Sequence, residues 1–247
     1  MNFDLSGRTG IVTGASSGLG LAIANVLAEA GATVHGFSRT GSVKEGSAPS
    51  HPGVVHTAVD VCDYAALEKA VKTAFAKGLD FLVNNAGVTV KKRAEEFLDE
   101  DFERIHRVNV SSVFKLSCLC YPHLKASAHK GRIVNITSMA AHLGFSEVVP
   151  YCSSKGAVLA MTRGLAIEWA EDNITVNSIA PGWFPSEMSK QVMDADRKAK
   201  ILSRMPVHKF GKPEDIGGMA LYLVSDAAEY VTGQDFAVDG GALAFGF

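Results

Sequence analysis

Residues Gly7–Gly20 read Gly-Arg-Thr-Gly-Ile-Val-Thr-Gly-Ala-Ser-Ser-Gly-Leu-Gly, and the alanine-rich stretch Leu21–Gly31 follows directly. The short apolar run around Arg8–Val12 is typical of a strand, and the alanine-rich stretch closed by Gly31 is typical of a helix. The glycines between them allow a tight turn and a close approach of the backbone to a pyrophosphate at the helix N-terminus. A turn in this place predicts a dinucleotide site, although its Gly-x3-Gly-x-Gly spacing departs from Gly-x-Gly-x-x-Gly.

Short apolar runs alternate with longer helical patterns along the rest of the chain. The predicted strands are Thr9–Val12, Thr33–Phe37, Val54–Val59, Leu79–Asn84, Arg132–Thr137, Thr175–Ala180 and Asp235–Val238. The predicted helices are Leu19–Ala30, Tyr64–Ala76, Leu98–Leu124, Tyr151–Ala170, Glu187–Arg204 and Pro213–Val224. This alternation predicts a single-domain, Rossmann-type α/β fold over residues 1–247, a doubly wound parallel sheet of about seven strands with helices on both faces. The Gly-, Ser- and Pro-rich stretch Thr40–Gly53 is predicted to be a loop.

Composition and charge agree with one cytoplasmic domain. The 247 residues are 47% hydrophobic, which is enough for a sizeable core. Lys and Arg total 24 and Asp and Glu total 26, so the formal charge of −2 gives no reason to expect nucleic acid or an anionic membrane as partner. No apolar run approaches the ~18 residues of a membrane helix, and Met1–Leu5 lacks signal-peptide character. The cysteines Cys62, Cys118, Cys120 and Cys152 match neither a disulfide framework nor a zinc site, so buried reduced thiols and no metal are expected.

Tyr151 and Lys155 are four residues apart, and Ser138 lies thirteen positions before Tyr151. On a helix, residues i and i+4 share a face, so the Lys155 ammonium would lie beside the phenol. A free tyrosine has a pKa near ~10, and we expect the neighbouring cation to lower it toward the range in which the phenol transfers a proton. Ser138 can supply a hydroxyl that holds a carbonyl or alcohol oxygen. Taken alone, Tyr-x3-Lys is a weak signal, because helices often carry an aromatic residue and a lysine one turn apart.

These motifs together resemble those of the short-chain dehydrogenase/reductase family, and the resemblance covers almost the whole chain. Thr13–Gly20 resembles the family's cofactor loop, Asn84-Asn85-Ala86-Gly87 its signature after the fourth strand, and Pro181-Gly182 its turn after the sixth strand. Asn109, Ser138, Tyr151 and Lys155 match its catalytic tetrad in order and spacing. The resemblance implies an oxidoreductase that interconverts a secondary alcohol and a ketone by hydride transfer from or to a bound nicotinamide.

The resemblance also implies a role for each member of the tetrad. Tyr151 is the general acid when a ketone is reduced and the base when an alcohol is oxidised. Lys155 lowers the pKa of Tyr151 and holds the nicotinamide ribose, while Ser138 holds the substrate oxygen. Asn109 keeps a water in the proton relay. The alternative for Asn109 is a polar side chain that satisfies a helix interior.

The cofactor residues implied by the resemblance are Gly14, Ser16, Ser17, Gly18, Leu19, Gly20, Ser38, Arg39, Asp60, Val61, Asn85, Ala86, Gly87, Tyr151, Lys155, Pro181, Gly182, Phe184 and Ser186. Asp60 either faces the adenine or caps the helix that begins near Asp63, and both readings stay open. NAD-preferring relatives place an acidic residue at the end of the second strand, where this chain has Ser38 followed by Arg39. Because an arginine binds phosphate oxygens bidentately, NADP(H) is expected rather than NAD, although the basic residue that similar NADP-dependent enzymes often have is missing at Ser17.

Two groups of relatives suggest two kinds of substrate. Phe184–Met188 and Asn84–Arg93 look similar to gluconate 5-dehydrogenase-like and sugar-acid members, whereas the general body also resembles 3-oxoacyl-carrier-protein reductases. A polar carbonyl or alcohol such as a sugar acid or polyol is therefore expected. A 3-oxoacyl thioester is one alternative, and a non-catalytic dinucleotide-binding sensor is an alternative from another class. Lys91, Lys92 and Arg93 form either a solvated surface run or a contact for a substrate carboxylate or phosphate, and His142 either lines the pocket or lies on a surface loop.

Assembly is also inferred from similar proteins, which pair through the helix carrying Tyr151 and Lys155 and through the next helix to form tetramers. Ala157, Leu159, Ala160, Leu165 and Ile167 give that helix more apolar surface than one sheet face can cover. The apolar end of the chain, Gly240–Phe247, would suit a subunit contact. A homotetramer with two-fold axes is therefore expected.

Overall fold

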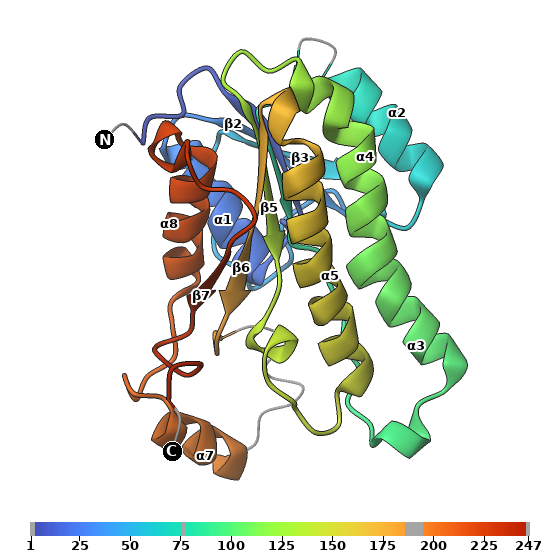
Figure 1. Ribbon diagram of the computed structural model, residues 1–247, viewed down its shortest axis with the longest axis vertical. Coiled ribbons are helices and arrows are strands. Elements are labelled where there is room, and N and C mark those ends of the chain that lie inside the picture. Colours follow the sequence, from blue (N-terminus) through green and yellow to red (C-terminus); the bar gives the residue numbers. More distant parts are fainter. Residues whose placement is uncertain (1–2, 76–77, 186–194, 246–247) are drawn as a thin grey trace.

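The computed structural model describes residues 3–75, 78–185 and 195–245. Parallel strands form one seven-stranded sheet in the order β3-β2-β1-β4-β5-β6-β7, with helices on both faces (Figure 1). The strands are β1 (Thr9–Thr13), β2 (Thr33–Ser38), β3 (Val54–Ala58), β4 (Phe81–Asn84), β5 (Gly131–Ile136), β6 (Ile174–Pro181) and β7 (Asp235–Val238). The helices are α1 (Gly18–Glu29), α2 (Tyr64–Ala74), α3 (Asp99–His106), α4 (Ser112–Lys125), α5 (Val149–Glu168), α7 (Ala195–Arg204) and α8 (Pro213–Val224). The predicted doubly wound α/β fold is confirmed.

The continuous apolar runs of the strands result from burial on both sheet faces. Ile133 packs with α2, α4 and α5 residues such as Leu67 and Leu116. Its neighbour Val134 packs on the other side, in the cluster that contains residues of α1 and α8. Because successive side chains on a strand point to opposite faces, a strand between two helical layers has no position at which a polar side chain meets water.

The predicted helix Leu98–Leu124 is wrong as one regular helix. α3 passes into a π-helical turn at Arg107–Ser111 before α4 begins. Asn109 lies in this turn, and its side-chain amide accepts a hydrogen bond from Val88 N at 2.8 Å and donates one to Val88 O at 3.0 Å. The widened turn lets the Asn109 side chain reach the segment after β4. This tertiary contact has no counterpart in the helical periodicity of the sequence.

The structure also tests one predicted strand boundary, the predicted loop and the state of the cysteines. The strand predicted from Leu79 begins at Phe81, and the segment Thr40–Gly53 contains neither helix nor strand, as predicted. All four cysteines are free, but only Cys120 is buried; Cys118 is exposed, and the other two lie between these extremes. The first eight residues of the helix predicted at Glu187–Arg204 lie outside the described residues.

The apolar surface of α5 differs from the expected one. Leu159 and Leu165 are buried in the monomer, whereas Ile167 is 80% exposed. Other exposed apolar side chains lie on α3 and α4, where Phe102 and Phe114 are about half-exposed. α3 and α4 precede α5 in the chain and lie beside it (Figure 1). Among the described residues, the exposed apolar side chains beside α5 therefore include those of the two preceding helices.

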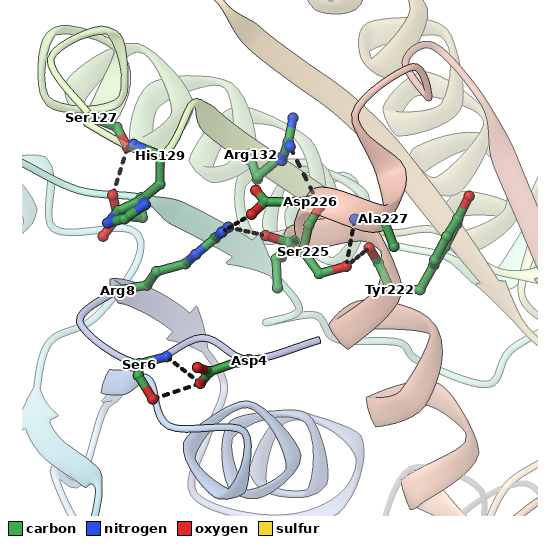
Figure 2. A network of polar contacts seen from close by, with 12 residues as sticks. Asp4, Ser6, Arg8, Ser127, His129, Arg132, Tyr222, Ser225, Asp226 and Ala227 are labelled. Atoms are coloured by element: carbon green, nitrogen blue, oxygen red, sulfur yellow. Dashed lines mark hydrogen bonds and ion pairs between the residues drawn. The ribbon is translucent and has the colours of Figure 1, made fainter. Parts of the chain in front are cut away.

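A polar network joins the amino-terminal ends of β1 and β5 to the end of α8 (Figure 2). Arg8 Nη2 forms an ion pair with Asp226 Oδ2 at 2.7 Å, and Arg8 Nη1 donates a hydrogen bond to Val224 O at 3.1 Å. The guanidinium of Arg132 is buried beside it and donates to Ser225 O at 3.4 Å. Burial lowers the pKa of Arg132 below its ordinary value. These contacts close one end of the sheet and leave the carboxyl ends of the strands as the open edge.

No helix of the described residues is long and apolar enough to cross a membrane.

Candidate active site

The carboxyl ends of the strands open into a cleft of about 1580 Å³. The chain leaves neighbouring strands β1 and β4 in opposite directions along the sheet, and this switch in strand order is where open α/β sheets bind ligands. Of the predicted cofactor residues, those that line the cleft are Gly14, Ser16, Ser17, Gly18, Leu19, Gly20, Ser38, Arg39, Asp60, Val61, Asn85, Ala86, Gly87, Tyr151, Lys155, Pro181, Gly182 and Phe184. Ser186 lies outside the described residues.

The glycine loop joins β1 to the N-terminus of α1 at one wall of the cleft. Gly14 has a φ of +68°, and a Cβ on Gly20 would lie 2.3 Å from Gly14 O, so larger residues would disrupt the turn. Thr13 Oγ1 accepts hydrogen bonds from Asn85 N at 2.9 Å and Ala86 N at 3.0 Å. Ser17 is the N-cap of α1 and its side chain makes no capping hydrogen bond. The loop therefore leaves a helix N-terminus and a serine hydroxyl at the cleft, a combination suited to a phosphate group.

Ser138, Tyr151 and Lys155 also line this cleft. The Ser138 side chain is close enough to the Tyr151 hydroxyl to influence its pKa. Lys155 is 5% exposed and its Nζ lies 5.7 Å from the centroid of the Tyr151 ring. Ser138 comes from the end of β5, and the other two come from successive turns of α5. The spacing predicted from the sequence therefore brings the three side chains to one wall.

The pKa values of this pair differ from the expectation. Burial raises the pKa of Tyr151 above its ordinary value, and the neighbouring Ser138 hydroxyl acts in the opposite direction. Burial also lowers the pKa of Lys155 to about 8. The Lys155 ammonium donates its hydrogen bond to Ile136 O at 2.7 Å. The prediction that the Lys155 cation lowers the pKa of Tyr151 is therefore wrong in this structure, since desolvation is the largest influence on both groups.

Asn109 lies behind the cleft, with 1% of its surface exposed. Besides its two bonds to Val88, its amide donates to Ser154 Oγ at 3.0 Å. A Cβ placed on Gly87 would be 3.4 Å from Asn109 Oδ1 and 3.7 Å from Lys155 Nζ, so the amide lies close to the catalytic wall. The structure agrees with the alternative interpretation, in which Asn109 is a polar side chain that is hydrogen-bonded inside a helix. Its relay role stays a prediction.

The two readings of Asp60 are separated by the structure. Asp63 caps α2, with Oδ1 accepting from Ala66 N at 3.0 Å. Asp60 Oδ1 instead accepts from Cys62 N at 2.8 Å, and Asp60 lines the cleft. The helix-cap alternative for Asp60 is therefore wrong, and its position is compatible with the adenine end of a cofactor.

The three cations after the Asn84–Gly87 signature form ion pairs. Lys91 pairs with Glu147 at 3.3 Å and Lys92 with Asp101 at 2.7 Å, while Arg93 pairs with Glu95. They are absent from the cleft lining formed by the described residues. Of the two interpretations, the surface run is the one that the structure favours, because each charge already has an acidic partner.

Sequence reasoning missed cations that do line the cleft. Lys44 belongs to the Thr40–Gly53 loop, and its backbone N donates to Ser16 O at 2.8 Å, which ties this loop to the glycine loop. Arg107 comes from the π-helical turn and donates to Cys62 O at 3.2 Å. No local pattern identifies these two residues, because their place in the cleft depends on a loop path and on the departure from regular helix.

Comparison with known proteins agrees with this site. Residues 14–242 match a family model described as Enoyl-(Acyl carrier protein) reductase. The chain is 38% identical over 246 residues to a 2-dehydro-3-deoxy-D-gluconate 5-dehydrogenase from Bacillus subtilis (strain 168), covering 98% of this chain and 96% of that protein.

Solved structures are similar over the same length. A putative NAD(P) dependent gluconate 5-dehydrogenase from Beutenbergia cavernae with bound NADP superposes with a TM-score of 0.90 and 39% identity, covering 99% and 100% of the two chains. A gluconate 5-dehydrogenase from Burkholderia cenocepacia J2315 in complex with NADP and tartrate has a TM-score of 0.89 and 32% identity, covering 98% of each chain. With a glycine loop and a Ser-Tyr-Lys wall on a seven-stranded parallel sheet, the chain belongs to the short-chain dehydrogenase/reductase family of oxidoreductases.

Proposed function

We propose that this protein is a single dinucleotide-binding and catalytic domain that interconverts a secondary alcohol and a ketone with NADP(H). The observation that carries the proposal is the grouping of Ser138, Tyr151 and Lys155 on one wall of the cleft. The nicotinamide supplies or accepts the hydride when bound. The side chains of the protein then have to hold the reacting oxygen and move one proton.

The proposed roles follow from these positions. The Ser138 hydroxyl holds the substrate oxygen, and the Tyr151 hydroxyl donates its proton to that oxygen in reduction or removes the alcohol proton in oxidation. The raised pKa keeps Tyr151 protonated at neutral pH, which suits its role as an acid. Lys155 holds the ribose, and Asn109 supports the relay by fixing the Gly87–Val88 backbone.

The cleft fits a dinucleotide with a 2′-phosphate. A Cβ on Gly14 or Gly20 would collide with the neighbouring backbone or with Asn85, so glycine at these positions keeps the tight turn that brings the backbone to the cofactor. At the end of β2, Ser38 is buried with its Oγ accepting from Gly41 N at 3.1 Å, and Arg39 is exposed at the cleft. Arg39 has no ion-pair partner among the described residues, so its guanidinium is available for a phosphate. Two of the similar structures contain NADP.

The cofactor assignment predicts the outcome of a double substitution, Ser38→Asp with Arg39→Leu. The new carboxylate would accept hydrogen bonds from ribose hydroxyls and repel a 2′-phosphate, and the lost guanidinium would no longer bind it. We expect the ratio of kcat/KM for NADPH over NADH to fall by ~10²-fold or more, equivalent to about 3 kcal/mol. Lys69→Leu, which removes an exposed cation of α2 outside the cleft lining, is the matched control. A wild-type protein that already prefers NADH would refute the assignment.

For the substrate we propose a polar carbonyl such as a sugar acid or polyol, supported by the similar gluconate dehydrogenases. A 3-oxoacyl thioester is the second candidate, because Phe145, Val148 and Trp183 add apolar lining to the cleft. The test is turnover with NADPH on a panel containing keto sugar acids, 3-oxoacyl thioesters and simple ketones. We expect the keto acids to give the highest kcat/KM. Preference for the thioester would favour the second candidate, and binding of NADPH without turnover of any carbonyl would favour a dinucleotide sensor.

We also propose a cytoplasmic homotetramer. Exposed Phe102, Phe114 and Ile167 on neighbouring helices support a subunit contact, since a monomer in water has little reason to expose such a group of large apolar side chains. The free state of all four cysteines is compatible with a reducing compartment. Elution of a dilute sample at the 26.1 kDa of one chain would contradict the tetramer.

A further inference from the structure

Asp235, at the start of β7, is not among the residues that line the cleft, but three side chains converge on its carboxylate. Its carboxylate is 6% exposed, and Oδ2 lies 2.6 Å from His142 Nε2. Oδ1 accepts a hydrogen bond from Thr137 Oγ1 at 2.8 Å and another from Ser178 Oγ. Thr137 immediately precedes Ser138, and His142 is four residues beyond it. One buried carboxylate therefore contacts the chain on both sides of the proposed catalytic serine.

The segment between these two contacts is itself a hydrogen-bonded turn. Ser138 is the N-cap of the 3-10 turn Met139–Ala141, and its Oγ accepts from Ala140 N at 3.1 Å. Ala141 N donates to Ser138 O, and His142 N donates to Met139 O, both at 2.9 Å. These hydrogen bonds hold residues 138–142 together as one turn. A displacement at Thr137 or His142 is therefore transmitted to the Ser138 hydroxyl.

Both contacts to Asp235 have the character of strong hydrogen bonds. The single Thr137 hydroxyl proton is shared between Asp235 Oδ1 and Ile179 O, which lies 2.9 Å away, and the carboxylate is the stronger acceptor. The His142 contact needs a proton on Nε2, which is present in one neutral tautomer and in the imidazolium. The contact therefore does not depend on a charged histidine. Removing the hydrogen-bond donors of a carboxylate as buried as this one strongly destabilises the folded protein.

We propose that Asp235 is a positioning residue of the active site: through Thr137 and His142 it fixes the turn that directs the Ser138 hydroxyl toward Tyr151 and the reacting oxygen. The inference rests on the proposed function, in which Ser138 holds that oxygen. Loss of either contact would let the hydroxyl shift, and a displacement of about 1 Å at a reacting group costs up to ~10²-fold in rate. Cofactor affinity should change little, because residues 138–142 are not among the proposed cofactor contacts.

The test compares four single variants in steady-state kinetics. Thr137→Val and His142→Ala remove one contact each and should lower kcat by about 10-fold while the KM for NADPH stays within about 2-fold. Asp235→Asn should retain more activity than Asp235→Ala, because an amide can still accept from Thr137 and donate to an unprotonated His142 Nε2. The matched control is Ser178→Ala, which removes a bond to the same carboxylate without touching the Ser138 turn. It should lower the melting temperature and leave kcat near the wild-type value.

Ser138→Ala in the same assay separates this inference from the proposed function. If Ser138→Ala lowers kcat but Thr137→Val and His142→Ala do not, Asp235 is a structural residue and the inference is overturned. The same holds if Ser178→Ala lowers kcat as much as Thr137→Val does. Full activity of Ser138→Ala would overturn the role of the serine, and the positioning role with it. His142 is partly exposed on the surface, so His142→Ala should fold even if Asp235→Ala does not.

Discussion

Tyr151→Phe should lower turnover by ~10²-fold or more, which is the usual scale for losing a general acid. The affinity for NADPH should stay nearly unchanged. The substitution removes only the phenolic hydroxyl, the group whose pKa the neighbouring Ser138 influences. The ring remains and can still pack against the cofactor side of the cleft. The measurement is kcat from initial rates, together with the dissociation constant for NADPH from a fluorescence titration of the same preparation.

Tyr121→Phe is the matched control for this experiment. The Tyr121 hydroxyl on α4 donates to Asp172 Oδ2 at 2.7 Å and is absent from the cleft lining of the described residues. Tyr121→Phe likewise removes one phenolic hydroxyl, here with its hydrogen bond to Asp172, so it should affect stability without reducing kcat. Near-normal activity of Tyr151→Phe would show that another group donates the proton.

The direction of the Tyr151 pKa shift extends the same prediction to pH. Because burial raises this pKa, the phenol stays protonated at neutral pH and is ready to donate in ketone reduction. Alcohol oxidation requires the phenolate, and its rate should therefore increase as the pH rises above neutrality. The two directions of the reaction should respond oppositely to alkaline pH in wild-type protein.

Lys155→Met should reduce kcat/KM by ~10²-fold or more, since the lysine is proposed to hold the ribose beside the phenol.

The same change should stabilise the protein at neutral pH. Burial lowers the pKa of Lys155 from 10.5 to about 8, which corresponds to about 3 kcal/mol of differential stability between the two protonation states. The unpaired Ile136 carbonyl would offset about 1 kcal/mol of this gain.

The pH dependence of that gain has a definite sign. The folded protein binds the Lys155 proton more weakly than the unfolded chain, so the destabilisation is complete below pH 8 and disappears as the pH rises toward 10.5. Urea unfolding of wild type and Lys155→Met at pH 7 and pH 10 measures it. We expect the variant to be more stable at pH 7, with a smaller difference at pH 10. A variant less stable at pH 7, or a difference independent of pH, would contradict the proposed cost of burying the ammonium.

Much of the fold could be predicted because its signals are local. The helix predicted at Pro213–Val224 has the same bounds in the structure, since a proline at the first position and the helical spacing of apolar residues define it within a dozen residues. The strand Asp235–Val238 was located equally well. The glycine loop and the Tyr-x3-Lys spacing are also local, and they predicted which residues of the loop after β1, of α1 and of α5 line one cleft.

The sequence by itself therefore determined the doubly wound sheet, the place of the cleft and the side chains that line most of it. Only the tertiary structure decided the π-helical turn at Asn109, the ion pairs of Lys91 and Lys92, and the contacts of Asp235. The reason is the range of the interactions. Periodicity and capping act over a few neighbouring residues, whereas Asp235 meets Thr137 across 98 positions and His142 across 93. The charge state of Tyr151 and Lys155 depends likewise on burial by distant segments, which no spacing of residues encodes.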